Sequence, residues 1–206
     1  MYLDIRKVET ISSLGGGPIG AGWAAHFLSK GYKVKSYIHD KSEKSIYESI
    51  IKTAWTSLKE IGLDKSASLN NLLISADLNE VIEGTQFVQE SIPENLTLKC
   101  ELYKTLGHLV PEEVVIASST SGLTMTEIQK LCSTPERTVI GHPFNPPYLL
   151  PLVEIVGGKK TSELAVKWAY DFYKHVGKEP LALKKEIPGF VATRLQEALW
   201  REALHM

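Results

Sequence analysis

A glycine-rich stretch near the start of the chain, Leu14-Gly15-Gly16-Gly17-Pro18-Ile19-Gly20, constrains the fold more than any other feature. Through Gly15, Gly17 and Gly20 it fits the pattern G-x-G-x-x-G. An apolar segment with strand character precedes this stretch, and a helical pattern from Ile19 to Ser29 follows it. A strand, a glycine turn and a helix in this order are typical of a dinucleotide-binding βαβ unit.

Each residue of the turn has a separate predicted role. Gly15 permits the tight turn, Gly17 lets a pyrophosphate approach the backbone, and Gly20 lets the helix pack closely on the strand. Pro18 and Ile19 begin the helix, whose first N–H groups and positive dipole end favour phosphate. We therefore expect these five residues to bind the cofactor.

Asp40 supports this interpretation, because it ends the next strand-like segment, Lys33–His39. A carboxylate in this place accepts hydrogen bonds from the ribose hydroxyls of the adenosine half. It also favours NAD over NADP, since a 2′-phosphate would meet its negative charge, although the neighbouring Lys41 weakens that preference. The alternative, a glycine-rich turn without a ligand, leaves the acidic residue at the end of the strand unexplained.

Composition limits the remaining possibilities. With 206 residues, of which 43% are hydrophobic, the chain can bury one sizeable core. A net charge of −1 gives no electrostatic case for binding nucleic acid or a membrane, and no apolar run approaches the ~20 residues that span a bilayer. Cys100 and Cys132 form no CxxC motif, and no histidine lies at ligand spacing, which predicts reduced thiols, no metal site and a cytoplasmic protein.

Strand and helix patterns alternate along most of the chain. The predicted strands are Val8–Leu14, Lys33–His39, Leu72–Ser75, Thr85–Gln89, Val114–Ala117, Arg137–Gly141, Leu152–Val156 and Glu179–Leu183. Helical patterns lie between them, and the one over residues 42–61 carries an apolar stripe formed by Ile46, Ile50, Ala54, Leu58 and Ile61. This alternation predicts an α/β fold, a Rossmann-type doubly wound and mostly parallel sheet.

The last part of the chain reads differently. Residues 1–187 account for the predicted Rossmann domain, and Pro188-Gly189-Phe190 open a further helix. The pattern of that helix has strong helix propensity and no stop signal, and it still runs at Met206. We therefore expect that a continuation is missing.

Three polar residues are candidates for catalysis. A dehydrogenase needs a base that removes the alcohol proton as hydride leaves. His142 comes at the C-terminal end of the sixth predicted strand, at the edge where doubly wound sheets bind ligands. Glu154 lies in an otherwise apolar strand, where a buried carboxylate is costly unless paired, and the proline turn between them can bring it beside His142. Ser121, after the fifth strand, can hydrogen-bond the substrate oxygen.

Each of these residues also has an ordinary interpretation. His142 can be a loop histidine, Glu154 can face solvent on an edge strand, and Ser121 can serve a turn or a helix cap. Their common placement at one edge of the sheet favours the catalytic interpretation.

Several motifs together resemble the 3-hydroxyacyl-CoA dehydrogenase superfamily, over nearly the whole chain and in the family's order. They are residues 15–20, Ser119-Thr120-Ser121, His142-Pro143-Phe144-Asn145-Pro146, Leu152-Val153-Glu154 and Pro188-Gly189-Phe190. The longer forms of these motifs are more similar to the L-carnitine dehydrogenase branch than to the acyl-CoA or L-gulonate branches. They cover residues 87–91, 117–123, 141–154 and 194–205.

The resemblance implies a role for each matching residue of the catalytic edge. His142 becomes the general base and Glu154 its partner. Ser121 binds the substrate hydroxyl, and Asn145 supports the loop that carries His142. The implied reaction is the NAD-dependent oxidation of the 3-hydroxyl of L-carnitine to 3-dehydrocarnitine.

On the cofactor side, the resemblance places Glu90 near the nicotinamide ribose. Ser119 stands where acyl-CoA members carry an asparagine near the carboxamide. Thr193 is a second departure, because acyl-CoA members carry asparagine there and carnitine-type members carry aspartate. An aromatic wall and an arginine clamp would hold carnitine's ammonium and carboxylate, with the candidates Phe144, Tyr148, Trp200, Arg194 and Arg201.

The resemblance also implies a helical C-terminal domain, begun by residues 188–206, that closes over a small-molecule substrate and forms a homodimer. Three functions stay open at this point. The first is a carnitine dehydrogenase present as its N-terminal part, and the second is a related 3-hydroxyacyl-CoA (3-hydroxybutyryl-CoA) or L-gulonate 3-dehydrogenase. The third is a non-catalytic NAD-binding module.

Overall fold

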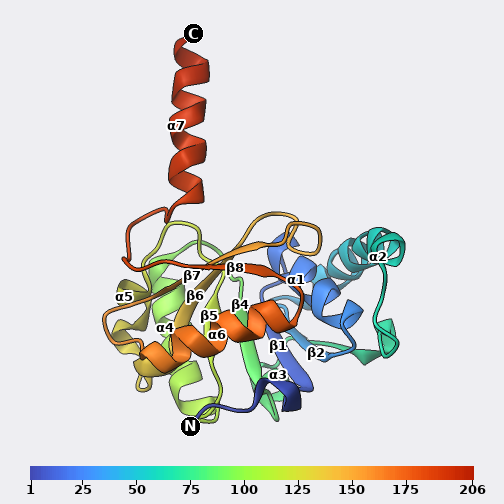
Figure 1. Ribbon diagram of the computed structural model, residues 1–206. Helices are drawn as coiled ribbons and strands as arrows, with labels where there is room; N and C mark the ends of the chain where they lie inside the picture. The colour runs from blue at the N-terminus through green and yellow to red at the C-terminus, as the bar shows by residue number, and fades with distance from the viewer.

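One eight-stranded sheet runs through the computed structural model, which describes residues 1–206 (Figure 1). Its strands lie in the order β3-β2-β1-β4-β5-β6-β7-β8. Their bounds are β1 Thr10–Leu14, β2 Lys33–Tyr37, β3 Leu72–Ser75, β4 Phe87–Glu90, β5 Ile116–Ser118, β6 Thr138–Pro143, β7 Leu152–Gly157 and β8 Glu179–Ala182. Neighbouring strands pair in parallel except β6 and β7, which are antiparallel. The predicted Rossmann-type fold is confirmed, since the chain winds outward from β1 in both directions.

Helices cover both faces of the sheet. They are α1 (Pro18–Ser29), α2 (Lys44–Ile61), α3 (Leu78–Ile82), α4 (Leu96–Leu109), α5 (Met125–Ile128), α6 (Glu163–His175) and α7 (Ala192–His205). On one face, Trp23 of α1, Tyr47 of α2 and Phe172 of α6 belong to a single buried cluster. On the other face, Tyr103 of α4 and Met125 of α5 belong to a second cluster. Strand residues alternate between the two cores, as expected for a sheet buried on both sides.

Helix α2 begins later than the sequence pattern predicts. In α2, residues 41–43 form a 3₁₀ turn, and the buried face consists of Tyr47, Ile51, Ala54, Trp55 and Leu58. Ile46 and Ile61 are 64% and 66% exposed, so the predicted apolar stripe is wrong at both positions. The spacing of four residues repeated along the stripe drifts around a helix with 3.6 residues per turn, and the two aromatic residues define the buried face instead.

The last helix, α7, begins at Ala192 rather than at Pro188-Gly189-Phe190. Gly189 and Phe190 have φ values of +74° and +47°, which a right-handed helix does not accommodate. The helix projects from the body of the molecule (red in Figure 1), and it has no buried residue. No helix in the structure combines the length and the apolar character needed to cross a membrane. Both cysteines are free thiols.

Candidate active site

The glycine loop joins β1 to α1 at the carboxyl edge of the sheet. Gly15 has a φ of +130°, and a Cβ at this position would collide with the backbone carbonyl of Ser91. A Cβ on Gly20 would collide in the same way with the carbonyl oxygen of Gly15. Both positions therefore require glycine, because the loop turns sharply and the helix lies directly against it.

Gly17, in contrast, faces open space. It is the exposed N-cap of α1, and a Cβ there would meet no atom within 4 Å. Pro18 occupies the first helical position, and Ala21 donates to the carbonyl of Gly17 at 3.0 Å. The backbone N–H groups of Ile19 and Gly20 precede that hydrogen bond, so they lack intrahelical partners at the positive end of the helix dipole. This arrangement fits a pyrophosphate.

Asp40 lies at the same edge, after β2, the parallel neighbour of β1. Its exposed carboxylate accepts a hydrogen bond from the backbone N–H of Ser42 at 2.8 Å. That hydrogen bond lowers the pKa of the Asp40 carboxyl. The group is therefore charged at neutral pH and accessible to a ribose hydroxyl.

His142 and Glu154 meet because β6 and β7 pair in antiparallel register. The two residues stand directly opposite each other, so their side chains share one face of the sheet. His142 Nδ1 lies 2.9 Å from Glu154 Oε2, and the two residues are 5% and 0% exposed. Burial raises the pKa of the Glu154 carboxyl, but hydrogen bonds from His142 and from the backbone of Ala192 and Val191 outweigh burial and hold that pKa below its usual value.

An ionised Glu154 fixes the state of the imidazole. A carboxylate can only accept, so Nδ1 of His142 carries the hydrogen and Nε2 is left with its lone pair. The imidazole ring packs against two aromatic rings, with ring centroids 5.1 Å away at Phe144 and 5.4 Å away at Phe190. The ring is therefore held in place, and Nε2 makes no hydrogen bond within the chain.

The serines near this edge differ in how much of each side chain is free. The hydroxyl of Ser119 accepts from Trp23 Nε1 at 3.2 Å and from Gln89 Nε2 at 2.8 Å, and it lies 2.8 Å from the hydroxyl of Ser91. Ser121 is exposed, and its backbone N–H donates to Glu94 Oε1 at 3.1 Å. Its hydroxyl makes no hydrogen bond within the chain, so it is available to a ligand.

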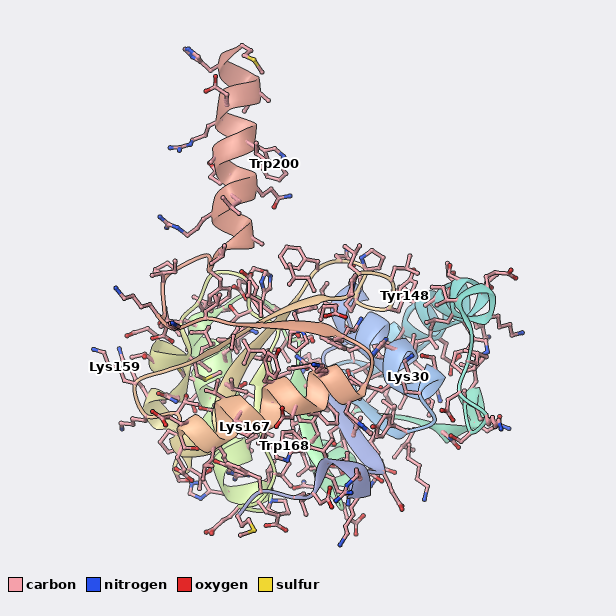
Figure 2. The ribbon with its side chains drawn as sticks, in the orientation of Figure 1. Lys30, Tyr148, Lys159, Lys167, Trp168 and Trp200 are labelled. Atoms are coloured by element: carbon pink, nitrogen blue, oxygen red, sulfur yellow. The ribbon has the colours of Figure 1, made fainter.

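The other predicted substrate contacts lie apart from one another. Asn145 is exposed on the loop after His142, and its side chain makes no hydrogen bond to that loop. Tyr148 packs against the core at the top of the body, whereas Trp200 is 58% exposed on the projecting helix (Figure 2). Tyr148 and Trp200 therefore do not form one aromatic wall in this structure.

Glu90, which the resemblance places near the nicotinamide ribose, has a side chain turned into the protein in this structure. It is fully buried, and its oxygens accept from Lys99 Nζ and the Ser118 hydroxyl at 2.5 Å each, and from the backbone N–H of Ile92 at 2.7 Å. A carboxylate with three internal donors and no exposed surface has no free side for a ribose. Glu90 therefore lies beneath the edge, where it holds the loop after β4.

Sequence reasoning missed three polar residues of this region. Glu94 accepts from the Thr120 hydroxyl at 2.5 Å and so fixes the turn that carries Ser121. Lys99 pairs with Glu90, and its place on the buried face of α4 was a usable signal, because a lone lysine on an apolar face needs a partner. Lys178, which is also buried, has no comparable signal in the sequence.

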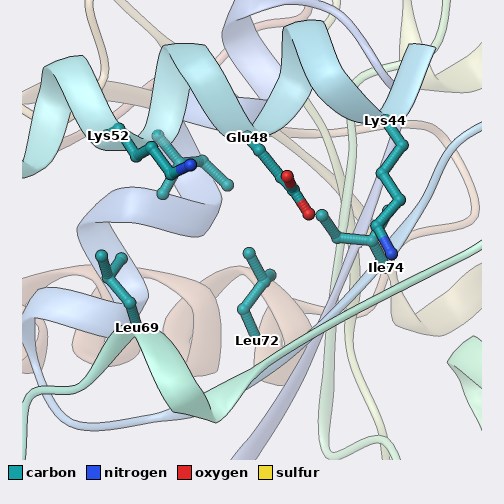
Figure 3. Close-up of a pocket in the computed structure, with 7 residues that line it drawn as sticks. Lys44, Glu48, Lys52, Leu69, Leu72 and Ile74 are labelled. Atoms are coloured by element: carbon teal, nitrogen blue, oxygen red, sulfur yellow. The ribbon is translucent and has the colours of Figure 1, made fainter.

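A surface hollow of about 270 Å³ lies away from this edge, between α2 and β3. Its lining residues are Lys44, Glu48, Ile51, Lys52, Leu69, Leu72 and Ile74. Figure 3 shows the side chain of Glu48 extending over the hollow toward Ile74. None of these residues belongs to the glycine loop or to the His142–Glu154 pair, so the hollow is separate from the candidate active site.

Comparison with known proteins agrees with this geometry. Residues 10–187 match the family model of the 3-hydroxyacyl-CoA dehydrogenase NAD-binding domain. The chain is also similar to a solved 5-formyl-3-hydroxy-2-methylpyridine 4-carboxylic acid 5-dehydrogenase, an NAD⁺-dependent dismutase. The TM-score is 0.90 at 32% sequence identity, over 96% of this chain and 64% of that one.

Two curated relatives are more similar in sequence, and both are named L-carnitine dehydrogenase. The protein from Nocardiopsis dassonvillei is 48% identical over 98% of this chain, and the one from Streptomyces griseus is 49% identical over 98%. The aligned regions are 61% and 60% of those proteins, so the chain spans about three fifths of the length of the relatives it matches.

Proposed function

The chain belongs to the 3-hydroxyacyl-CoA dehydrogenase family, and from that premise we propose that it is the NAD-binding part of an enzyme that oxidises the 3-hydroxyl of L-carnitine to 3-dehydrocarnitine. The observation that carries the proposal is the buried His142–Glu154 pair, 2.9 Å apart, at the edge of an NAD-binding fold. The identity of 48% to a protein named L-carnitine dehydrogenase supports the choice of substrate.

In this proposal His142 is the general base. Its Nε2 takes the proton of the substrate hydroxyl, and the carbon that loses hydride becomes a ketone. Bound NAD⁺ supplies the acceptor for that hydride. Glu154 stabilises the imidazolium that forms and keeps the ring oriented. Ser121 orients the substrate oxygen through its free hydroxyl, and Asn145 lines the approach to His142.

The cofactor contacts follow the same edge. The backbone N–H groups at the start of α1, from Gly17 to Gly20, bind the pyrophosphate, and Asp40 binds the adenosine ribose. Ser119 lies between the cofactor and the core and contacts the nicotinamide end. The cofactor is NAD rather than NADP because the charge of Asp40 repels a 2′-phosphate.

We further propose that residues 1–187 form the NAD-binding domain and that α7 begins a helical domain for substrate binding and dimerisation. The apolar side chains of Leu195 and Leu199, which lie one turn apart on α7, are 62% and 71% exposed, and such a face usually packs against a partner. The greater length of the relatives supports this division. The protein would then be a cytoplasmic homodimer, in keeping with its free thiols.

The experiment is a comparison of substrates with a parallel measurement of cofactor binding. NADH formation is followed by absorbance with L-carnitine, 3-hydroxybutyryl-CoA and L-gulonate, and NAD⁺ binding by calorimetry on the same sample. We expect turnover with L-carnitine, and we expect His142→Gln to reduce it by at least about a hundredfold while NAD⁺ affinity is unchanged.

The other outcomes point to the alternatives. Turnover of 3-hydroxybutyryl-CoA or L-gulonate without L-carnitine would make the second function correct. NAD⁺ binding without turnover of any hydroxy acid, both in this chain and in a chain carrying the C-terminal part, would favour a non-catalytic NAD-binding module.

A further inference from the structure

Glu154 has a second set of hydrogen-bond partners besides His142. Its Oε2 faces His142, while its Oε1 accepts hydrogen bonds from the backbone N–H groups of Val191 at 2.9 Å and Ala192 at 3.0 Å. Val191 is the N-cap of α7 and Ala192 is its first residue. One buried carboxylate therefore joins the imidazole to the start of the projecting helix.

The chain just before α7 also contacts the imidazole. The ring of Phe190 is fully buried, and its centroid is 5.4 Å from that of His142. Phe190 has a φ of +47°, and Gly189 before it has a φ of +74°. Left-handed backbone is unusual for phenylalanine, and here it turns the chain so that the ring reaches His142 while the next two N–H groups reach Glu154.

A second carboxylate fixes the same segment from its other end. Glu186 accepts from the backbone N–H of Thr126 at 2.9 Å and from the Thr126 hydroxyl at 2.5 Å. The connection between β8 and α7 is therefore tied to the body at Glu186, before the bend, and at Glu154, after it. A helix N-terminus adds a positive partial charge beside Glu154, which opposes the cost of burying the carboxylate.

From these contacts we propose that residues 189–192 are a positioning element for the His142–Glu154 pair, so that the placement of α7 governs the orientation of the catalytic base. The inference rests on the proposed function for its catalytic meaning. A carboxylate held at both oxygens cannot rotate, and it presents Oε2 to Nδ1 in one direction. If α7 moves away, Oε1 loses both donors, and the carboxylate is free to turn from His142.

The test removes the N–H donor of one residue without changing its side chain. Replacing Ala192 by lactic acid, in semisynthetic protein, changes one amide to an ester and deletes the hydrogen bond to Glu154 Oε1. The matched control is the same amide-to-ester change at Leu195, whose N–H donates to the carbonyl of Val191 at 3.0 Å within α7. Both changes cost the helix one backbone donor, but only the first touches Glu154.

The first readout is the pKa of the Glu154 carboxyl, followed by carbon NMR during a pH titration. His142, on β6, is the titratable group that faces this carboxylate, so its ring signals are recorded in the same titration. We expect the ester at 192 to raise the pKa of Glu154 by roughly one unit, and the ester at 195 to leave it unchanged. Equal shifts in both proteins, or no shift in either, would overturn the proposal.

The second readout is the pH profile of kcat/KM with L-carnitine. It is measured in whichever protein oxidises L-carnitine, this chain or the chain that carries the C-terminal part. The ester at 192 should move the acidic limb of the profile to higher pH, with NAD⁺ affinity unchanged, because ionised Glu154 is needed for the dyad. An unmoved limb would count against the positioning role. The NMR titration needs no turnover. If L-carnitine is not the substrate, the titration still shows whether the Ala192 N–H acts on Glu154, so the two proposals can fail separately.

Discussion

The ammonium group of Lys178 lies over the indole ring of Trp23, with Nζ 5.3 Å from the ring centroid. The same Nζ donates to the backbone carbonyl of Pro147 and, at 3.1 Å, to that of Leu150. Both carbonyls belong to the loop that follows His142. Lys178 thus fastens the loop beside the candidate base to the core, and it does so with a side chain in a residue that is only 4% exposed.

The burial of Lys178 predicts a pH dependence of stability. Burial, with a smaller contribution from the charge of Lys30, lowers the pKa of Lys178 from 10.5 to about 7. Between these two values the unfolded chain holds a proton that the folded chain has released, so the free energy of unfolding rises with pH. One proton difference corresponds to a slope of at most about 1.4 kcal/mol per pH unit.

Urea denaturation between about pH 7 and pH 9.5 measures this slope. Lys178→Met should remove its contribution, whereas Lys174→Met, at an exposed position of α6, should leave it in place. Parallel pH curves for the wild type and Lys178→Met would mean that the buried amine is not the source of the slope.

Much of the fold could be predicted because local signals agreed with it. The glycine pattern placed β1 and α1, and Asp40 marked the end of β2. The approach of Glu154 to His142 was also predictable, since a proline turn joins two strands of which one carries a lone carboxylate in an apolar run. The catalytic roles of both residues stay predictions.

The parts that could not be predicted depend on contacts between distant residues. Nothing near Glu154 in the sequence indicates that its second oxygen caps a helix 37 and 38 positions later. The sequence also gives no sign of the left-handed backbone at Phe190, because phenylalanine rarely adopts a positive φ. The burial of Glu90 depends likewise on a residue of the next helix, its ion-pair partner Lys99 of α4, although a lone lysine on the apolar face of that helix was a signal for such a partner.

Glu90 and Lys99 form an ion pair with both side chains almost fully buried, 0% and 1% exposed. Lys99→Met should leave Glu90 buried without its cation and destabilise the protein by about 3–5 kcal/mol. Adding Glu90→Gln to Lys99→Met should recover part of that loss, since an amide costs less to bury than an unpaired charge. Urea denaturation of the two variants checks the order.

A surface pair of similar length serves as the control. Lys167 Nζ lies 2.8 Å from Asp171, but both side chains are exposed, so Lys167→Met should cost less than about 1 kcal/mol. A loss in Lys99→Met no larger than that of Lys167→Met would show that the buried pair contributes little.

Asp40 should set the choice between NAD and NADP. Asp40→Asn keeps the cap on Ser42, because asparagine is as good an N-cap as aspartate, but it removes the charge. We expect NADP⁺ to bind at least about tenfold more tightly than in the wild type, and NAD⁺ somewhat less tightly. Calorimetric titration with both cofactors decides the matter, and an unchanged preference would remove Asp40 from the cofactor site.

Replacement by alanine should destabilise the protein at Gly20 but not at Gly17. Gly20→Ala places a Cβ against the carbonyl oxygen of Gly15, so the loop or the helix must shift, and we expect a loss of about 1–3 kcal/mol in urea denaturation. Gly17→Ala meets no atom within 4 Å, and its φ of −80° suits any residue, so its stability should stay within about 0.5 kcal/mol of the wild type.

NAD⁺ binding by Gly17→Ala tests whether the open space at Gly17 holds the cofactor. In calorimetry, Gly17→Ala should weaken NAD⁺ binding by about tenfold or more, because the new methyl group occupies the approach to the first N–H groups of α1. A stable Gly17→Ala protein with full NAD⁺ affinity would place the pyrophosphate elsewhere. The expected result, a stable protein that binds NAD⁺ weakly, would locate the pyrophosphate at Gly17 and the start of α1.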